Sequence, residues 1–161
     1  MRITCSDKCS SSFAAAASVT ASFLCLLVAI GIYILFRDRG MVVFHLIDAM
    51  GMGEMIDGFR EDVAGVHLAE FILYSLPDGL YAASYVILVG WLLRNASRGF
   101  RFAMVGFIPV LGVLSELLQP IGLVPGTFDV WDLVCFAAPY IIYIIEEIIS
   151  KKINYGTIIK Q

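Results

Sequence analysis

The chain has 161 residues, 60% of them hydrophobic, with a mean hydropathy of +0.87 and a formal net charge of -3. Soluble globular domains contain about 45 to 50% apolar residues, so this composition excludes that class and predicts a polytopic membrane protein. The acidic balance also excludes a general nucleic-acid binder, because contacts with phosphates require a basic surface. Any contact with DNA would have to pass through a partner protein.

Long apolar runs predict the fold. A helix needs about 20 apolar residues to cross the ~30 Å hydrocarbon core, and four stretches meet or nearly meet that length: 13–36, 71–93, 102–124 and 130–149. We therefore predict an all-α fold, a four-helix transmembrane bundle in a single membrane domain covering 1–161. The first run carries no charge and exceeds the about 7 to 15 residues of a secretion-signal core, so we expect an uncleaved anchor.

Local motifs refine two of these helices. The second run contains Pro77-Asp78-Gly79, where we expect a break or kink, because proline removes a backbone donor and glycine loosens the helix that follows. The fourth run follows an acidic turn, and we expect Thr127 or Asp129 to be its N-cap.

The segment 37–70, between the first two runs, mixes apolar residues and methionines with acids. This pattern predicts an outer loop of one or two short amphipathic helices, broken around Gly51-Met52-Gly53. Two interpretations stay open, a lid that covers the bundle and a sensing surface. Methionine-rich faces adapt to several partners, which favours contact with another molecule.

Lysine and arginine placement predicts that both termini are cytoplasmic in a bacterial inner membrane. The inner side then holds eight basic residues, and the outer side only Arg37, Arg39 and Arg60. Most basic turns attract anionic lipid head groups, but the turn 94–101 and the apolar tail 150–161 also suit a cytoplasmic protein partner, itself a possible nucleic-acid binder. The candidate docking residues are Arg94, Arg98, Arg101, Lys151 and Lys152.

Six polar residues lie within or beside the predicted spans. A carboxylate at the bilayer centre costs at least ~2.5 to 3.5 kcal/mol, so such residues usually face a bundle interior and mark a site. With a rise of ~1.5 Å per residue, the predicted topology places all six in the outer half of the membrane. This polar intramembrane cluster consists of Glu70, Asp78, Glu116, Gln119, Asp129 and Asp132.

Three roles are open for this cluster. The acids can hold a cation or share protons, perform acid–base work on a lipid-linked substrate, or hydrogen-bond helices together. No serine or cysteine in the spans lies beside a histidine, and His45 and His67 lack metal-ligand spacing. We therefore predict no catalytic residue, metal or cofactor. Four scattered cysteines, Cys5, Cys9, Cys25 and Cys135, are expected to be thiols.

The motif Glu116-x-x-Gln119, followed by Gly126-Thr127-Phe128-Asp129-x-x-Asp132-Leu133, resembles the signature of VanZ-like membrane proteins. In that family an E-x-x-Q on one span precedes an F-D-x-x-D that opens the next. The resemblance covers 112–145 and, loosely, the second span. It departs from the family where Phe136-Ala137-Ala138 replaces an asparagine and a glycine. The resemblance implies an envelope role, in glycopeptide resistance or with phospholipids.

By size and architecture the chain is also similar to the four-span membrane subunit of the Kiwa anti-phage defence system. That similarity implies a homo-oligomeric membrane sensor that relays envelope perturbation to a soluble, DNA-binding partner. The preferred hypothesis from the sequence is accordingly a non-enzymatic sensor or scaffold of the inner membrane that holds a cytoplasmic effector. The alternative is a VanZ-like envelope factor or enzyme acting on lipid-linked or phospholipid substrates.

Overall fold

The computed structural model describes the backbone of residues 5–158 and the side chains of residues 13–150. This part of the chain folds into six helices: α1 (Cys5–Phe36), α2 (Val42–Ala49), α3 (Gly53–Asp62), α4 (Glu70–Leu92), α5 (Arg98–Leu118) and α6 (Val130–Ile158). Four of them, α1, α4, α5 and α6, are long and apolar enough to cross a membrane. The predicted all-α fold with four spans is confirmed.

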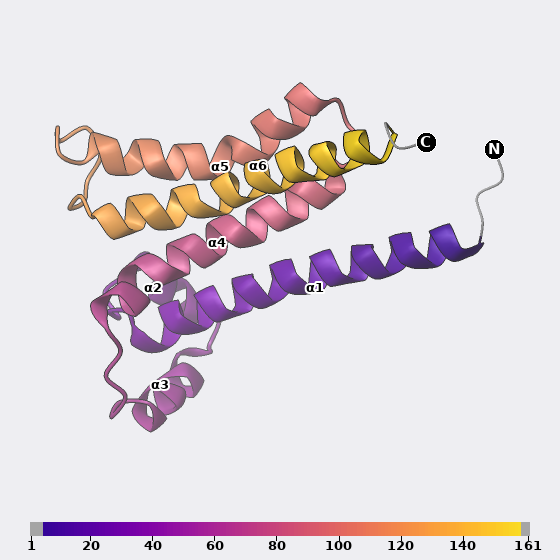
Figure 1. Ribbon diagram of the computed structural model, residues 1–161. Coiled ribbons are helices and arrows are strands. Elements are labelled where there is room, and N and C mark those ends of the chain that lie inside the picture. The colour runs from indigo at the N-terminus through magenta and orange to yellow at the C-terminus, as the bar shows by residue number, and fades with distance from the viewer. Residues whose placement is uncertain (1–4, 159–161) are drawn as a thin grey trace.

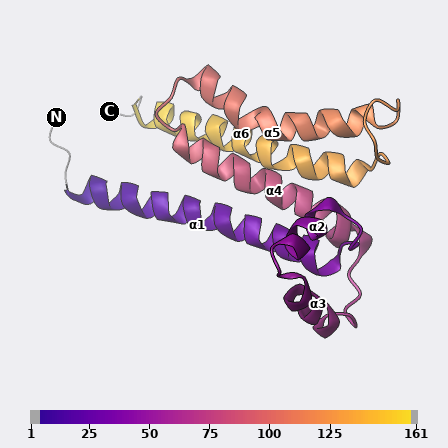
Figure 2. The ribbon, with the colours of Figure 1, turned by 180° about the vertical axis from the view of Figure 1, so that it is seen from behind.

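The four long helices run up and down, so that the start of α1 and the end of α6 lie at the same end of the bundle (Figure 1). We call this the terminal end. At the opposite end, the loop end, lie α2, α3 and the turn between α5 and α6 (Figures 1 and 2). The start of α1 and the end of α6 therefore lie on one side of any membrane that the bundle crosses, and the assignment of that side to the cytoplasm stays a prediction.

Helix α4 is the central element. It contacts α1, α5 and α6, and α6 also contacts α5. Within the described residues, α1 packs on α4 and α3, and its Ile34 packs against the apolar cluster that includes Phe44 and Ile47 of α2. The backbone of α1 makes no contact with α6. Figures 1 and 2 show α1 diverging from the other three long helices toward the terminal end.

The helix boundaries differ from the sequence prediction at three places. Helix α5 spans Arg98–Leu118 rather than 102–124, because Pro120 has no backbone donor and the following turn uses Gly122 at a φ of 72°. Helix α4 continues through Pro77, so the expected break is absent. Helix α6 extends to Ile158, so much of the predicted tail is helical.

Two sequence expectations at the loop end are met. The outer loop forms two short helices, α2 and α3, and the chain turns between them with Gly51 at a φ of 74°. Asp129 directly precedes α6, and its Oδ1 accepts a hydrogen bond of 2.8 Å from the backbone N–H of Trp131. Asp129 is therefore the N-cap of α6.

Glycines allow α6 to pack closely between α4 and α5. A Cβ on Gly112 of α5 would lie 2.3 Å from Cδ1 of Phe136, and one on Gly79 of α4 would lie 3.0 Å from Cβ of Cys135. Real Cβ atoms essentially never approach other atoms as closely as the first of these distances. Close approach through small residues is how transmembrane helices gain packing contacts without a hydrophobic driving force.

Hydrogen bonds also join neighbouring helices. The hydroxyl of Tyr140 in α6 donates to the carbonyl of Phe102 in α5 at 3.0 Å. Between α1 and α4, the hydroxyl of Ser22 donates to the carbonyl of Ser84 at 2.8 Å and lies 3.0 Å from its Oγ. These serines are buried, and such interhelical bonds satisfy groups that hydrocarbon would leave unpaired.

The substitution Gly112→Ala tests the packing of α6. Its Cβ would collide with the Phe136 ring, and such overpacking costs about 1 to 3 kcal/mol. The matched control is Gly31→Ala in α1, where a Cβ meets no atom within 4 Å and alanine favours the helix. Thermal unfolding in detergent should show a lower Tm for Gly112→Ala and an unchanged or higher Tm for Gly31→Ala. Equal melting temperatures for the two variants would contradict this packing.

Candidate functional site

Carboxylates from three spans converge near the loop end of the bundle. Asp78 lies two turns into α4, Glu116 in the last turn of α5, and Asp132 in the first turn of α6. Gly79, next to Asp78 in α4, packs against Cys135, one turn after Asp132 in α6. Glu116 accepts a hydrogen bond from the backbone N–H that directly precedes α6. We call Asp78, Glu116 and Asp132 the carboxylate centre. Because their helices come from different parts of the sequence, only the packing of α4, α5 and α6 brings them together.

Glu116 is the anchor of the carboxylate centre. It is only 6% exposed, and its Oε1 accepts a hydrogen bond of 2.7 Å from Nε2 of Gln119. Its Oε2 lies 3.5 Å from the backbone nitrogen of Asp129, which donates to it. A Cβ on Gly126 would lie 2.9 Å from Cδ of the Gln119 amide, so the turn closes directly over that side chain. Glu116 thus ties the end of α5 to the start of α6.

Two of the other three predicted members of the polar intramembrane cluster adjoin the carboxylate centre. Gln119 and the backbone N–H of Asp129 both donate hydrogen bonds to Glu116. Glu70 is exposed at the first residue of α4, about two turns from Asp78 along the helix. The structure therefore brings five of the six predicted residues into one neighbourhood, while Glu70 stands at the surface.

Arg37, at the end of α1, supplies a positive charge to the centre. Its guanidinium carbon lies 4.7 Å from the ring centroid of Tyr74, which stands one helical turn before Asp78 in α4. From the sequence, Arg37 was assigned only to the outer side of the membrane. Its position directly after an uncharged span was the signal that a positive charge stands at this end of the bundle.

Four polar side-chain atoms near the centre are buried and lack a hydrogen-bond partner among the described residues. They are Oε1 of Gln119, Oδ1 of Asp132, Oγ of Ser75 and Nε of Arg37. Ser75 is 1% exposed and lies one helical turn before Asp78. Buried polar groups are nearly always paired, so these atoms mark capacity for a further polar group. The sequence analysis missed Ser75, because a lone serine within an apolar run carries no distinctive pattern.

A protonated carboxyl donates a hydrogen bond and an ionised one only accepts, while an amide side chain such as that of Gln119 does both. The carboxylate centre and Gln119 can therefore offer donors and acceptors to a polar ligand. In the described part of the chain, no three His, Cys, Asp or Glu side chains group closely enough to hold a metal ion.

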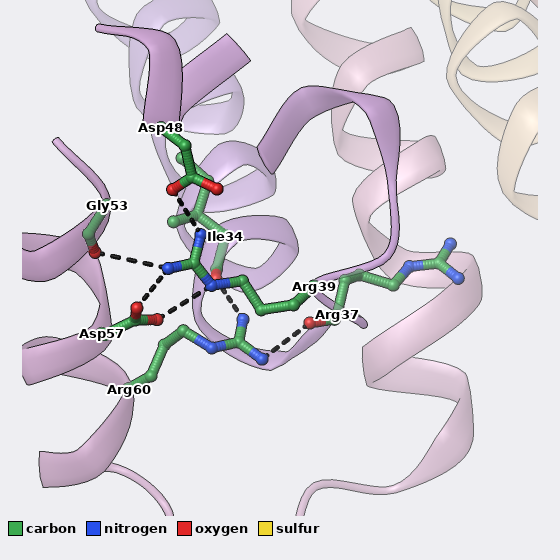
Figure 3. A network of polar contacts seen from close by, with 7 residues as sticks. All are labelled: Ile34, Arg37, Arg39, Asp48, Gly53, Asp57 and Arg60. Carbon is green, nitrogen blue, oxygen red and sulfur yellow. Dashed lines mark hydrogen bonds and ion pairs between the residues drawn. The ribbon is translucent and has the colours of Figure 1, made fainter. Parts of the chain in front are cut away.

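A second arrangement of charges organises α2 and α3 (Figure 3). Arg39 donates from Nη1 to Oδ1 of Asp48 at 2.9 Å and from Nε to Oδ1 of Asp57 at 2.9 Å, and its Nη2 contacts Oδ2 of Asp57 as well. These bonds raise the pKa of the Arg39 guanidinium above its usual value, and the bond to Asp57 has a larger effect than the bond to Asp48. Arg39 therefore stays charged and joins the end of α2 to α3.

Arg60 of α3 attaches the same pair of helices to α1. Its Nη1 donates to the carbonyl of Ile34 at 2.6 Å and its Nη2 to the carbonyl of Arg37 at 2.8 Å (Figure 3). The last carbonyls of a helix have no intrahelical partner, so Arg60 satisfies the end of α1 and complements its dipole. Beneath these contacts, Phe44 is fully buried, and the guanidinium carbons of Arg39 and Arg60 lie 5.4 and 5.3 Å from its ring centroid.

The predicted docking residues have different surroundings. Arg101 donates from Nη2 to Oε2 of Glu147 at 2.6 Å, with side chains 15% and 23% exposed. It is therefore held inside the α5–α6 pair. Arg94 and Arg98 are exposed. Lys151 and Lys152 lie outside the residues whose side chains the structure describes.

The described cysteines and histidines belong neither to the carboxylate centre nor to the ion pairs of α2 and α3. Cys25 and Cys135 are free thiols, and the side chains of Cys5 and Cys9 lie outside the described residues. His45 and His67 are both exposed and belong to different segments of the loop end.

The substitution Glu116→Leu tests the anchor role of this carboxylate. It would leave the Gln119 amide and the Asp129 N–H without their acceptor, which costs about 1 to 3 kcal/mol. Glu116→Gln keeps a carbonyl acceptor and removes one of three like charges, so its loss of unfolding free energy should be smaller. Glu70→Gln at the exposed start of α4 is the control and should change stability by less than about 0.5 kcal/mol. Chemical unfolding in detergent measures all three, and equal effects for Leu and Gln at 116 would contradict the anchor.

The substitution Arg39→Gln tests the ion-pair arrangement of α2 and α3. Without the guanidinium, Asp48 and Asp57 face each other without compensation, so the backbone amides of residues 42–62 should exchange hydrogen faster. The four spans should keep their protection. Arg98→Gln, which removes an exposed arginine at the other end of the bundle, is the matched control. Unchanged exchange in 42–62 after Arg39→Gln would show that Arg39 does not hold these helices.

A scan against models of known protein families, and searches of the curated proteins and of the solved structures, found no match to this chain. Its assignment as a multi-pass membrane protein rests on the four long apolar helices. The role of the carboxylate centre rests on its geometry and on the motif described above.

Proposed function

We propose that this multi-pass membrane protein uses its carboxylate centre to bind the polar part of a lipid-linked or phospholipid component of the cell envelope. The observation that carries this proposal is the convergence of Asp78, Glu116 and Asp132 from three separate spans, which the close packing of Gly79 on Cys135 and the hydrogen bond from the Asp129 N–H to Glu116 bring about. The residues that resemble the VanZ-like signature, Glu116, Gln119, Asp129 and Asp132, are the ones that surround this centre. The role implied by that resemblance is therefore the one that the geometry supports best.

The centre is suited to a polar head group that carries both donors and acceptors. Protonated carboxyls and the Gln119 amide can donate, while ionised carboxylates can accept. Arg37 offers a positive charge for a phosphate. With two carboxyl groups in different protonation states, the same arrangement is suited to moving a proton to or from a bound head group. In the predicted orientation this binding takes place in the outer half of the membrane.

A second candidate is the sensor or scaffold role, as the membrane component of a two-protein anti-phage defence system. The observation that favours it is the surface of α2 and α3, which exposes the apolar side chains Leu46, Met50, Met55 and Phe59. In this proposal that surface contacts the envelope, and the exposed Arg94 and Arg98 hold a cytoplasmic effector. The protein would act there as a homo-oligomer without chemistry of its own.

Complementation in the native host separates the two candidates. Lipid analysis of cells that lack the protein should show a change in one lipid-linked or phospholipid class, restored by the wild type and by Glu70→Gln. Asp132→Asn should assemble normally yet fail to restore that class, because it removes one carboxylate from the centre. Membrane extraction and thermal unfolding check the assembly of each variant.

The sensor role predicts an unchanged lipid profile and a stable cytoplasmic partner. An unchanged lipid profile would contradict the envelope proposal. The scaffold role would then be assigned if the protein captures one defined cytoplasmic partner. The double variant Arg94→Gln with Arg98→Gln should abolish that capture, and Asp132→Asn should leave it intact. Loss of assembly in Asp132→Asn would instead identify the carboxylate centre as interhelical support.

A further inference from the structure

A groove opens on the side of the bundle between α1, α4 and α6. It has a volume of about 620 Å³, within the ~300 to 1,000 Å³ typical of ligand pockets. It exists because α1 and α6 each contact α4 but their backbones do not contact each other within the described residues. The divergence of α1 toward the terminal end widens the space (Figure 2).

The walls of this groove are apolar along most of its length. The middle is lined by Ala83 and Ile87 of α4 and by Ala138 and Ile142 of α6, and Gly79 and Cys135 line its part nearest the loop end. These residues belong to segments that are long and apolar enough to span a membrane. The groove is therefore open to the hydrocarbon of the bilayer, and an acyl chain fits its chemistry.

Charged residues line the groove only toward the terminal end. Arg94 and Glu146 both line it there, together with Trp91. The Arg94 guanidinium carbon lies 4.6 Å from the Trp91 ring centroid, and its Nη1 donates to the Trp91 carbonyl at 3.2 Å. Both charged side chains are exposed. The neighbouring acid Glu147 is the one that pairs with Arg101, so among the described side chains the groove presents one cation and one anion to a ligand.

We propose that this groove is a binding site for a phospholipid whose head group carries a primary ammonium, of the phosphatidylethanolamine class. One acyl chain lies along the apolar walls toward Gly79 and Cys135. The phosphate contacts Arg94, and the ammonium donates to Glu146. Trp91 lies at the level of the head group, as tryptophans at membrane interfaces do. The site lies at the terminal end and does not depend on the role of the carboxylate centre.

Charge complementarity selects this occupant over an anionic phospholipid without an ammonium, which would place its phosphate beside Glu146 without compensation. A helix from a second copy of the chain could also fill the apolar walls, and the oligomeric state of the Ala138→Trp variant separates that occupant from a lipid. The lipid supplies both the apolar chain and the two charges.

Lipid titration of the purified full-length chain tests the head-group contacts. Native mass spectrometry in detergent would compare phosphatidylethanolamine, phosphatidylcholine and phosphatidylglycerol with identical acyl chains, and the first should bind most tightly. Arg94→Gln should weaken binding of all three about fivefold, the effect of one basic residue at a lipid surface. Glu146→Gln should remove the preference for the ammonium lipid over phosphatidylcholine, whose head group has no N–H. Arg98→Gln, which removes an exposed arginine outside the groove, should change neither the affinity for the three lipids nor the preference for the ammonium lipid.

Filling the groove tests the acyl-chain contacts. Ala138→Trp should abolish lipid retention, and the smaller Ala83→Leu on the opposite wall should reduce it. Leu114→Trp, on an exposed part of α5, should have no effect. Equal binding of the three lipids by the wild type, or retention of lipid by Ala83→Leu at wild-type level, overturns the proposal. Conversion of an oligomer to a monomer by Ala138→Trp with lipid binding unchanged also overturns it, and identifies the groove as an interface between copies.

Discussion

The close packing of α6 between α4 and α5 is the constraint on which the rest of the structure depends. Phe136 lies where a side chain on Gly112 would otherwise stand, and Cys135 lies directly against Gly79. These contacts set the depth and rotation of α6, so Asp132 in its first turn comes to Asp78 and Glu116. Without a hydrophobic driving force between spans, such steric fit is the main source of their association. The glycines are therefore structural determinants of the site.

This packing places like charges together, and the surrounding polar groups make that arrangement tolerable. Glu116 is buried but accepts bonds from Gln119 and from the start of α6. Arg37 brings a positive charge from α1. The balance is incomplete, since Gln119 and Asp132 each keep a buried oxygen without a partner among the described residues. Structures accept such a cost most readily at sites that bind or react.

The two ends of the bundle have different chemistry. The loop end combines the carboxylate centre with the paired helices α2 and α3, which Arg39 and Arg60 hold to each other and to α1 (Figure 3). The terminal end carries the Arg101–Glu147 pair and the exposed Arg94 and Glu146. Because the backbone of α1 makes no contact with α6 in the described part of the chain, the bundle is open on one side. That opening forms the groove that links the two ends.

The sequence by itself determined the class, the four spans and the helical character of the outer loop, because each follows from local composition or spacing. It narrowed the N-cap of α6 to Thr127 or Asp129, and the structure selected Asp129. The sequence also identified the residues of the carboxylate centre, since polar groups stand out within apolar runs. Only the tertiary structure decided that α4 continues through Pro77 and that Glu70 stands apart from the carboxylate centre. It also decided that Arg101 pairs with Glu147, and that Arg37 and Ser75 adjoin the centre. These features depend on which faces of separate helices meet, and a side chain's neighbours across a bundle leave no mark on its own local sequence.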